Sequence, residues 1–265
     1  MSYQLALITG ASSGIGEAFA HALPATTGLL LTGRDEARLS ALRESLGSAD
    51  RKVETLAADL GQEAGRAALL AAAERCQPDL LINNAGLGFY GPFLDNAPEA
   101  EREMVEVNVT APLVLTRALL PGMLERARAT GRRAGLILVS STAAFMALPY
   151  FSTYAATKAF DLSLAEGLAG ELRKEPIDVL GLCPGATATR FFERSGMAGS
   201  SLPIEQADEA ATVAREGLAA LGRQTTLVIG RQNKAMTMLA QRLPREMVRR
   251  GTRSFMRRGL KPRRA

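Results

Sequence analysis

The sequence predicts a doubly wound α/β fold, in which a seven-stranded, mostly parallel sheet carries helices on both faces. Short apolar runs alternate with helix-like stretches along the chain. A glycine-rich turn follows the first of these runs directly. With 265 residues, 47% of them apolar, the chain is long enough to bury one large α/β core. We therefore expect one Rossmann-type domain over residues 1–230 and an extension over 231–265.

The strands of this sheet are expected where the chain is most apolar and β-branched. They are predicted at residues 4–9, 28–33, 52–58, 79–83, 134–140, 177–183 and 225–230. Because helices separate them, neighbouring strands should run parallel. The functional site is then expected beyond the carboxyl ends of the strands.

The first strand ends in Gly10-Ala-Ser-Ser-Gly-Ile-Gly16, and a helix is predicted to follow over residues 17–23. Gly10 permits a tight turn, and Gly14 lets the backbone approach a pyrophosphate. Gly16 allows the helix to pack closely on the strand, with the helix N-terminus facing the phosphates. A flexible Gly-Ser loop is the alternative, but such a loop would not be framed by a strand and a helix. The pattern predicts a dinucleotide site.

The end of the second strand bears on which dinucleotide is bound. An acidic residue there binds the ribose hydroxyls of NAD, whereas an arginine accommodates the phosphate of NADP. Here the strand ends at Gly33, and Arg34 follows with a guanidinium suited to a phosphate. Asp35 is interpreted as the cap of the next helix. We expect NADP(H) rather than NAD(H).

Tyr154 and Lys158 are four residues apart, and Ser141 lies thirteen residues upstream of the tyrosine. On a helix, this spacing places the lysine ammonium on the same face as the phenol. A cation there lowers the pKa of the tyrosine toward the range where it exchanges protons with a carbonyl oxygen. The Ser141 hydroxyl would donate a second hydrogen bond to that oxygen.

Taken together, these motifs resemble the short-chain dehydrogenase/reductase family over about residues 5–230. Thr9 to Gly16 matches the family's glycine motif, and Asn83-Asn-Ala-Gly86 matches its motif after the fourth strand. Ser141, Tyr154 and Lys158 match its catalytic residues, and Asn108 matches its fourth catalytic position. Residues 184–189, Pro-Gly-Ala-Thr-Ala-Thr, match its segment near the nicotinamide.

The resemblance implies a role for each matched residue. Tyr154 would be the proton donor and acceptor, Lys158 would tune it and bind the nicotinamide ribose, and Asn108 would hold a water in a proton relay. Without the family, a helix kink or a buried amide would be the preferred reading of Asn108, and Thr189 could equally be a helix N-cap. The cofactor-binding residues implied are Gly10, Ser12, Ser13, Gly14, Ile15, Gly16, Arg34, Asp59, Leu60, Asn84, Ala85, Gly86, Tyr154, Lys158, Pro184, Gly185, Thr187 and Thr189.

The activity expected is NADP(H)-dependent interconversion of a ketone or aldehyde and its alcohol. Apolar residues at 88–93, 145–150 and 191–197 would line the substrate region, where the family carries a lid extending here to about residue 202, and they suggest a hydrophobic substrate. One alternative is a 3-oxoacyl thioester reductase, marked by a cationic patch for a carrier's phosphates. Another is a catalytically silent NADP(H) sensor, which would have no need of all four catalytic matches.

The remaining features predict a cytoplasmic protein, and an oligomer, as a homodimer or homotetramer, is expected. The N-terminus enters a strand at once, and the sequence shows no uninterrupted apolar run long enough to span a bilayer. Cys76 and Cys183 lack metal-ligand spacing and are interpreted as reduced thiols. His21 is the only histidine, so a zinc site is not expected.

Residues 231–265 are strongly basic. They contain twelve Lys or Arg against one acid, a balance of +11, whereas the whole chain carries +5, so residues 1–230 carry −6. Apolar residues at helical spacing on either side of Pro244 predict two short amphipathic helices. These helices could dock on the body as a wall of the substrate pocket or on a second subunit, or lie on an anionic membrane. Nucleic acid is disfavoured because no recognition module accompanies the charge.

Overall fold

The computed structural model describes residues 3–197 and 208–260. Its centre is a seven-stranded parallel sheet in the order β3-β2-β1-β4-β5-β6-β7. The strands are β1 (Leu5–Thr9), β2 (Gly28–Gly33), β3 (Val53–Ala57), β4 (Leu80–Asn83), β5 (Ala134–Val139), β6 (Ile177–Cys183) and β7 (Thr226–Val228). Each lies within the range predicted for it. The doubly wound fold class is confirmed.

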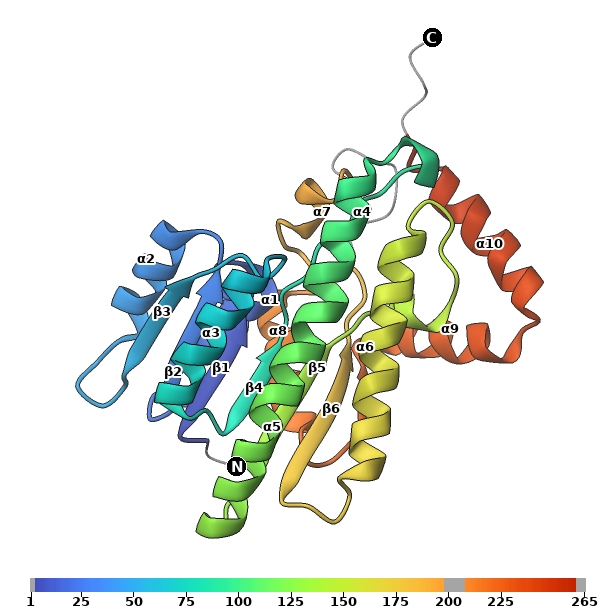
Figure 1. Ribbon diagram of the computed structural model, residues 1–265. Coiled ribbons are helices and arrows are strands. Elements are labelled where there is room, and N and C mark those ends of the chain that lie inside the picture. Colours follow the sequence, from blue (N-terminus) through green and yellow to red (C-terminus); the bar gives the residue numbers. More distant parts are fainter. Residues whose placement is uncertain (1–2, 198–207, 261–265) are drawn as a thin grey trace.

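Helices cover both faces of this sheet (Figure 1). The cores place α1, α2 and α8 on one face, and α3, α5 and α6 on the other. The helices are α1 (Gly14–Ala22), α2 (Glu36–Leu46), α3 (Glu63–Cys76), α4 (Pro98–Val105), α5 (Ala111–Thr130), α6 (Ser152–Glu171), α7 (Phe191–Arg194), α8 (Ala210–Ala220), α9 (Arg231–Arg242) and α10 (Arg245–Arg257). Shorter turns are η1 (Phe93–Asp95), the π-helical η2 (Glu106–Thr110) and η3 (Thr142–Phe145).

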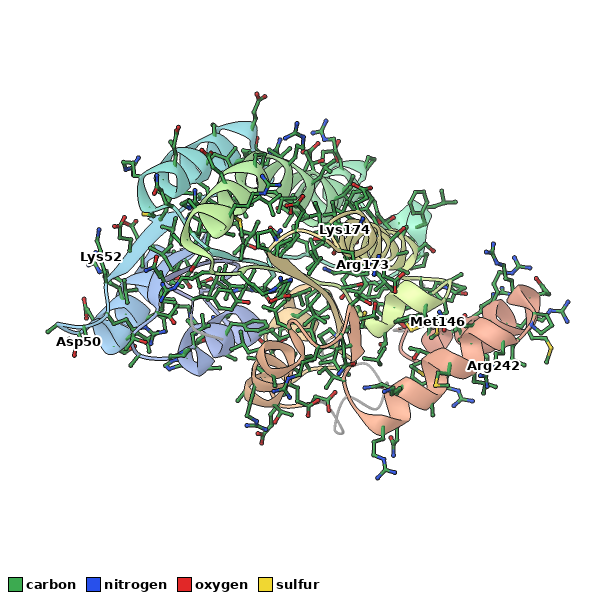
Figure 2. All side chains as sticks on the ribbon, turned by 90° about the horizontal axis from the view of Figure 1, so that it is seen from below. Asp50, Lys52, Met146, Arg173, Lys174 and Arg242 are labelled. Carbon is green, nitrogen blue, oxygen red and sulfur yellow. The ribbon has the colours of Figure 1, made fainter. Side chains whose placement is uncertain are left out.

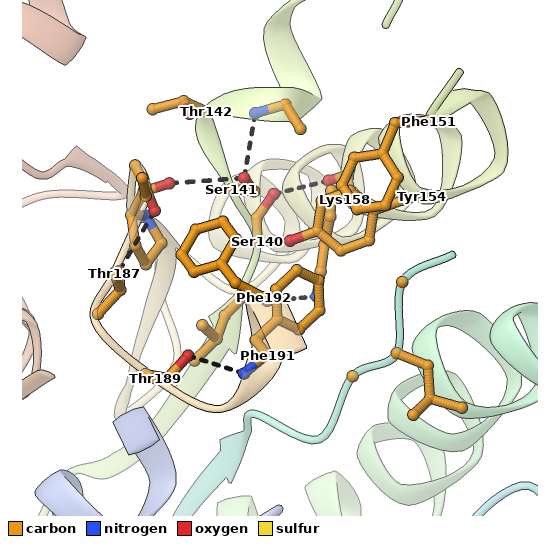
Figure 3. Close-up of a pocket in the computed structure, with 18 of the residues that line it drawn as sticks. Ser140, Ser141, Thr142, Phe151, Tyr154, Lys158, Thr187, Thr189, Phe191 and Phe192 are labelled. Carbon is orange, nitrogen blue, oxygen red and sulfur yellow. Dashed lines mark hydrogen bonds between the residues drawn. The ribbon is translucent and has the colours of Figure 1, made fainter. Parts of the chain in front are cut away.

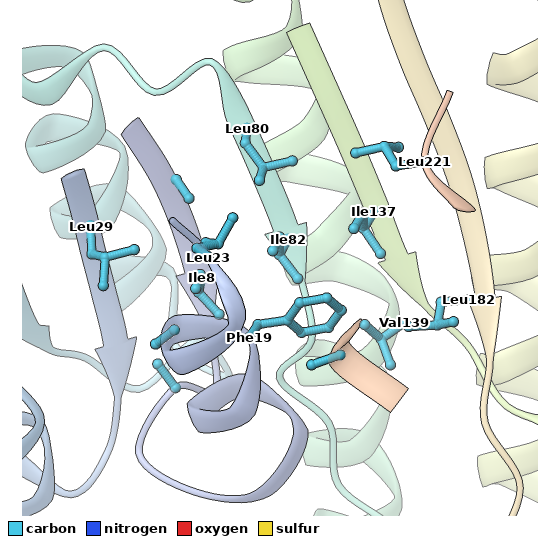
Figure 4. Close-up of a cluster of buried hydrophobic side chains, with 14 of the residues drawn as sticks. Ile8, Phe19, Leu23, Leu29, Leu80, Ile82, Ile137, Val139, Leu182 and Leu221 are labelled. Carbon is cyan, nitrogen blue, oxygen red and sulfur yellow. The ribbon is translucent and has the colours of Figure 1, made fainter. Parts of the chain in front are cut away.

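The central strands read as continuous apolar runs because both of their faces are covered. Every residue of β4, β5 and β6 is buried. On the α1 side, the fully buried ring of Phe19 belongs to a core cluster with residues of β1, β2, β4, β5 and β6, including Ile8, Ile82 and Val139 (Figure 4). This packing fixes the first turn of α1 against the carboxyl ends of the strands, where the glycine-rich turn lies.

The strand order reverses between β1 and β4, and at such a switch point the loops on the two sides diverge and leave a crevice. The helical stretch Pro98–Thr130, formed by α4, η2 and α5, lies beside this crevice. By length and composition this helical stretch could cross a bilayer. From the sequence we expected no segment able to do so. Its residues Ala111, Leu115 and Met123 are buried against the sheet, as in the core helix of a soluble domain.

The two helices predicted in the basic segment are present as α9 and α10, with Pro244 between them. They form an arm that stands off the side of the sheet (Figures 1 and 2). Contacts between α9 and η3 join the arm to the body beside Met146, and Arg242 lies on the arm itself (Figure 2). The sheet, the crevice and this arm together enclose the site described next.

Candidate active site

A main chamber of about 1000 Å³ opens at the carboxyl ends of the strands. It runs from the glycine-rich turn, past the end of β5 and the start of α6, to the inner side of the arm. Of the residues predicted for catalysis or cofactor binding, those that line it are Gly10, Ser12, Ser13, Gly14, Ile15, Arg34, Asp59, Leu60, Asn84, Ala85, Gly86, Ser141, Tyr154, Lys158, Pro184, Gly185, Thr187 and Thr189. Gly16 and Asn108 lie behind this wall.

Gly10 and Gly16 have the backbone properties for which they were singled out, while the approach of a pyrophosphate to Gly14 stays a prediction. Gly10 and Gly14 have φ of 66° and 62°, in the region that favours glycine. A Cβ on Gly16 would lie 2.4 Å from the carbonyl oxygen of Gly10 and 2.6 Å from Asn84 Nδ2. Close packing of α1 on the end of β1 therefore requires glycine at this position, and it leaves the N-terminus of α1 facing the main chamber.

The two neighbouring serines at the end of β5 have different partners. The hydroxyl of Ser140 donates to the backbone oxygen of Lys158 at 2.6 Å, so it holds α6 against the strand. The Ser141 hydroxyl accepts a hydrogen bond from the amide of Ala143 at 3.1 Å and lies toward Tyr154 (Figure 3). The Ser141 hydroxyl also donates to the Pro184 carbonyl oxygen at 3.5 Å and lines the main chamber, so its predicted role toward a substrate oxygen stays a prediction.

The Tyr154 ring stacks on Phe151, with centroids 4.3 Å apart, and meets Phe191 at 5.3 Å (Figure 3). Burial raises the pKa of the Tyr154 phenol, while the charge of Lys158 and the hydrogen bond with Ser141 lower it. The sequence reasoning identified the lowering by Lys158 but not the burial. In this apolar enclosure the burial outweighs it, and the phenol is held in its protonated form.

Lys158 is buried and makes two hydrogen bonds within the protein. Its Nζ donates to the Val139 carbonyl oxygen at 2.8 Å and to Asp161 Oδ2 at 3.0 Å. Burial opposes the ammonium form, but the Asp161 carboxylate, together with Tyr154, holds the pKa of Lys158 above its ordinary value. The sequence analysis missed Asp161, although its position three residues after Lys158 on one helix was a usable signal.

Asn108 lies in η2, where the helix between α4 and α5 widens into a π-helical turn. Its Oδ1 accepts from the Leu87 amide at 2.8 Å, and its Nδ2 donates to the Leu87 carbonyl and to Thr157 Oγ1. The side chain is fully buried and ties η2 to the loop after β4 and to α6. The kink and the backbone-bonded amide, both considered from the sequence, are present together.

The opposite end of the main chamber is built from the residues that follow β2. Arg34 Nη1 lies 3.0 Å from Glu103 Oε1 on α4, and both side chains are partly exposed. Asp35 caps α2 by accepting from the amide of Arg38 at 3.1 Å, as predicted. Asp59 Oδ1 accepts from the Gly61 amide at 3.0 Å and holds the turn after β3. Glu103 is a second residue that the sequence did not reveal.

The segment after β6 brings the apolar wall over Tyr154. Thr189 Oγ1 accepts from the amide of Phe191 at 3.2 Å, so Thr189 holds the start of α7. A Cβ on Gly88 would meet the rings of Phe191 and Phe151 at 2.7 and 2.8 Å, which shows how closely these rings pack. The lid predicted beyond Met197, through Leu202, lies outside the described residues.

The arm closes the remaining side of the main chamber with apolar residues. The apolar residues that line it are Met236, Leu239 and Ala240 of α9, Leu243 just after α9, and Met247, Val248, Gly251, Phe255 and Met256 of α10. The Tyr90 hydroxyl donates to the Met256 carbonyl, and the Thr252 hydroxyl donates to the Ala147 carbonyl at 2.9 Å. The arm is therefore docked on the body, which was one of the alternatives that the sequence left open.

This arrangement fits a nicotinamide dinucleotide. Glycine residues and a helix N-terminus line one end of the main chamber, as a pyrophosphate requires. An ammonium donates three hydrogen bonds, and Lys158 uses two of them within the protein. The third is available on the chamber side for a ribose hydroxyl.

Comparisons with known proteins agree with this fit. The family model described as short chain dehydrogenase matches residues 4–198. A curated relative from Bos taurus, dehydrogenase/reductase SDR family member 7B, is 31% identical over 238 residues, which are 84% of this chain and 72% of that protein. Across the first curated relatives the chain spans 58% to 72% of their length.

Two solved structures extend the likeness to nearly the whole chain. A short-chain dehydrogenase from Sphingobium yanoikuyae in complex with NADPH has a TM-score of 0.74 at 29% identity, covering 91% of this chain and 96% of that one. A 3-ketoacyl-(acyl-carrier-protein) reductase from Brucella melitensis complexed with NADH has a TM-score of 0.73 at 29% identity, covering 85% and 96%. With the family model covering most of the sequence, the chain belongs to the short-chain dehydrogenase/reductase family of oxidoreductases.

Proposed function

We propose that this protein is an NADP(H)-dependent carbonyl reductase or alcohol dehydrogenase acting on a hydrophobic ketone or aldehyde. The observation that carries the proposal is the position of Ser141 and Tyr154 in a chamber that is also lined by the rings of Phe151, Phe191 and Phe192 and by the apolar side of the arm. A carbonyl oxygen can reach two hydroxyl groups there, while the rest of its molecule contacts rings and aliphatic side chains.

Each polar residue of the site has one task in this proposal. Tyr154 gives its proton to the oxygen of the reduced carbonyl, and Ser141 orients that oxygen by donating a hydrogen bond. Lys158 keeps its positive charge close to the phenol, with Nζ 6.0 Å from the ring centroid. Asn108 holds η2 in place, and a Cβ on Gly86 would lie 3.5 Å from Asn108 Oδ1 and 3.6 Å from Lys158 Nζ, so the amide lies near the lysine, as a relay requires. The nicotinamide, when bound, supplies or accepts the hydride.

The preference for NADP(H) rests on the residues after β2. The strand-end position itself is Gly33, which has no side-chain carboxylate to bind ribose hydroxyls. The nearby carboxylates of Asp35 and Glu103 are engaged with Arg38 and Arg34. Arg34 lines the main chamber and offers a planar guanidinium that suits a phosphate. Its present partner, Glu103, is partly exposed, so a phosphate would exchange for a weak surface ion pair.

A long substrate is favoured by the inner side of the arm. Leu239, Met247 and Phe255 are 57%, 58% and 44% exposed, and all three line the main chamber. Apolar surface of this kind is stabilised when an apolar ligand covers it, at about 25 cal/mol per Å². Because α9 and α10 direct these residues inward, we assign the arm to substrate binding. Co-sedimentation with anionic liposomes at low salt tests the alternative membrane role.

Reduction of a 3-oxoacyl thioester is the second candidate, and the arginine face supports it. This face comprises Arg242, Arg245, Arg249, Arg250, Arg253 and Arg257, all of which are exposed on the arm. A carrier's phosphates could bind there while the acyl chain lies along the inner side of the arm. The resemblance to the Brucella melitensis reductase is consistent with this class of substrate.

The experiment measures NADPH consumption by the purified full chain with aliphatic, aromatic and steroidal ketones, aldehydes and 3-oxoacyl thioesters. Tyr154→Phe is the matched variant, since it removes only the proton-transferring oxygen. Turnover that disappears in this variant while NADPH affinity is kept supports the proposal, and the rates rank the substrate classes. Equal turnover in both proteins would refute the role of Tyr154. Tight NADPH binding without turnover of any substrate would favour a sensing protein.

A further inference from the structure

Two buried oxygen atoms without hydrogen-bond partners belong to residues that line one small chamber behind the active site. Within the described residues, Asp161 Oδ1 and Asn83 Oδ1 are buried and make no hydrogen bond. Asp161 is 3% exposed and Asn83 6%. Both residues line a chamber of about 10 Å³, whose other walls are Thr9, Leu60 and apolar residues of η2 and α5.

The size and polarity of the small chamber indicate what it holds. A volume of 10 to 15 Å³ on this measure accommodates one water molecule. A carboxylate oxygen and an amide oxygen both accept hydrogen bonds, so their common partner must donate two, as water does. An unpaired buried acceptor costs about 1 to 3 kcal/mol, which a bridging water would remove.

We propose that Asp161, held by a buried water shared with Asn83, is a positioning residue that orients and charge-balances the catalytic lysine. One oxygen of Asp161 accepts from Lys158 Nζ at 3.0 Å, and the other is buried without a partner in a residue that lines the small chamber. With the Val139 carbonyl as second acceptor, the ammonium is fixed so that its one remaining hydrogen faces the main chamber.

The charge of Asp161 has a second consequence, at Tyr154. Burial is the largest effect that raises the pKa of Tyr154 and the charge of Lys158 lowers it, while the Asp161 carboxylate adds a smaller increase. The titratable groups close to Asp161 are Lys158 and Tyr154 on its own helix, and Cys183, which faces Lys158 from β6. Asp161 thus adds to the effect of burial, which keeps the phenol protonated and able to act as an acid.

The test reads the phenolate absorbance of Tyr154 directly. The ultraviolet titration curve of Tyr154→Phe is subtracted from that of the wild type, and the difference gives the pH at which this phenol ionises. The same two proteins are also compared in the presence of Asp161→Asn. The expected result is ionisation about one pH unit lower in Asp161→Asn. The matched control is Asp178→Asn, prepared with and without Tyr154→Phe, because Asp178 is another buried, ion-paired aspartate with one unpartnered oxygen, located at the start of β6. Asp178 also acts on Tyr3, but the difference curve for Tyr154 should equal the wild type's.

Ionisation at the wild-type pH in Asp161→Asn would overturn the proposal. Should that variant fail to fold, a high-resolution crystal structure of the wild type decides, since a water within hydrogen-bond distance of Asp161 and Asn83 is required. A small chamber without such a water would overturn the proposal too. The proposal depends on the family chemistry at Tyr154, but not on which substrate or dinucleotide is bound. The titration requires neither ligand. A failed substrate panel therefore leaves this test intact.

Discussion

Replacing Arg34 by alanine should weaken NADPH binding while leaving NADH binding unchanged. A hydrogen bond between a guanidinium and a phosphate contributes about 1.5 to 3 kcal/mol. In the free protein, however, Arg34 is already bonded to Glu103 at 3.0 Å, and a partly exposed pair of this kind contributes up to about 1 kcal/mol. The net loss is therefore about 0.5 to 3 kcal/mol, or about a 2- to 140-fold increase in the Kd for NADPH.

The same reasoning predicts a gain from Glu103→Gln. Removing the carboxylate frees Arg34 for the phosphate, so NADPH should bind up to about fivefold more tightly. In the double variant with Arg34→Ala, this gain should vanish, because no guanidinium remains to be released. Isothermal titration calorimetry with NADPH and NADH measures all four proteins.

The matched control for these variants is Arg128→Ala. Arg128 forms a comparable exposed ion pair with Glu175, away from the main chamber, and its loss should change neither affinity. Equal weakening of NADPH and NADH by Arg34→Ala would refute the assignment of Arg34 to the phosphate. It would indicate instead that Arg34 supports the shape of the site as a whole.

Three further predictions follow from other parts of the structure. Gly16→Ala should abolish binding of either dinucleotide in calorimetry, because its Cβ would lie 2.4 Å from the Gly10 oxygen; wild-type affinity would contradict this packing. Burial raises the pKa of the Tyr3 phenol above the value of about 10 that it has in the unfolded chain. The free energy of unfolding should therefore be unaffected by Tyr3 below pH 10 and fall by about 1.4 kcal/mol per pH unit above it. Urea unfolding at pH 9 and 11 should show a smaller loss in Tyr3→Phe than in the wild type. Phe255→Glu should raise KM for long apolar ketones about tenfold and spare short ones, whereas Met238→Glu, outside the chamber lining, should affect neither.

Each strand of the sheet could be predicted because the signal, a run of apolar residues, lies within the strand itself. Strands buried on both faces must be apolar along their whole length, and β4, β5 and β6 are. The glycine-rich turn could be predicted equally well, since each glycine is required by the backbone conformation or packing of residues close to it in the sequence. The helix that follows β2 was identified from Asp35, whose side chain caps it as expected.

The features that the sequence did not reveal depend on contacts between distant segments. Glu103 reaches Arg34 across 69 positions of the chain, so no spacing rule connects them. The net pKa direction of Tyr154 depends on rings brought from the loop before α6 and from α7. The amphipathic pattern of the arm predicted two helices but not which surface their apolar side would cover. Asp161 is the exception, since it lies one helical turn from Lys158.

The separation of charge between the arm and the body has a consequence for the rate at which substrates arrive. Among the described residues, 231–260 carry nine Lys or Arg against Glu246, a balance of +8, and the rest carry −5, so an electric dipole runs across the molecule from the body to the arm. Residues of both parts line the main chamber. A ligand that bears phosphate or carboxylate groups is drawn along this field toward the arm before any contact forms, and its association slows as salt screens the field. Neutral ketones are not attracted in this way, so capture in dilute solution favours anionic substrates over neutral ones.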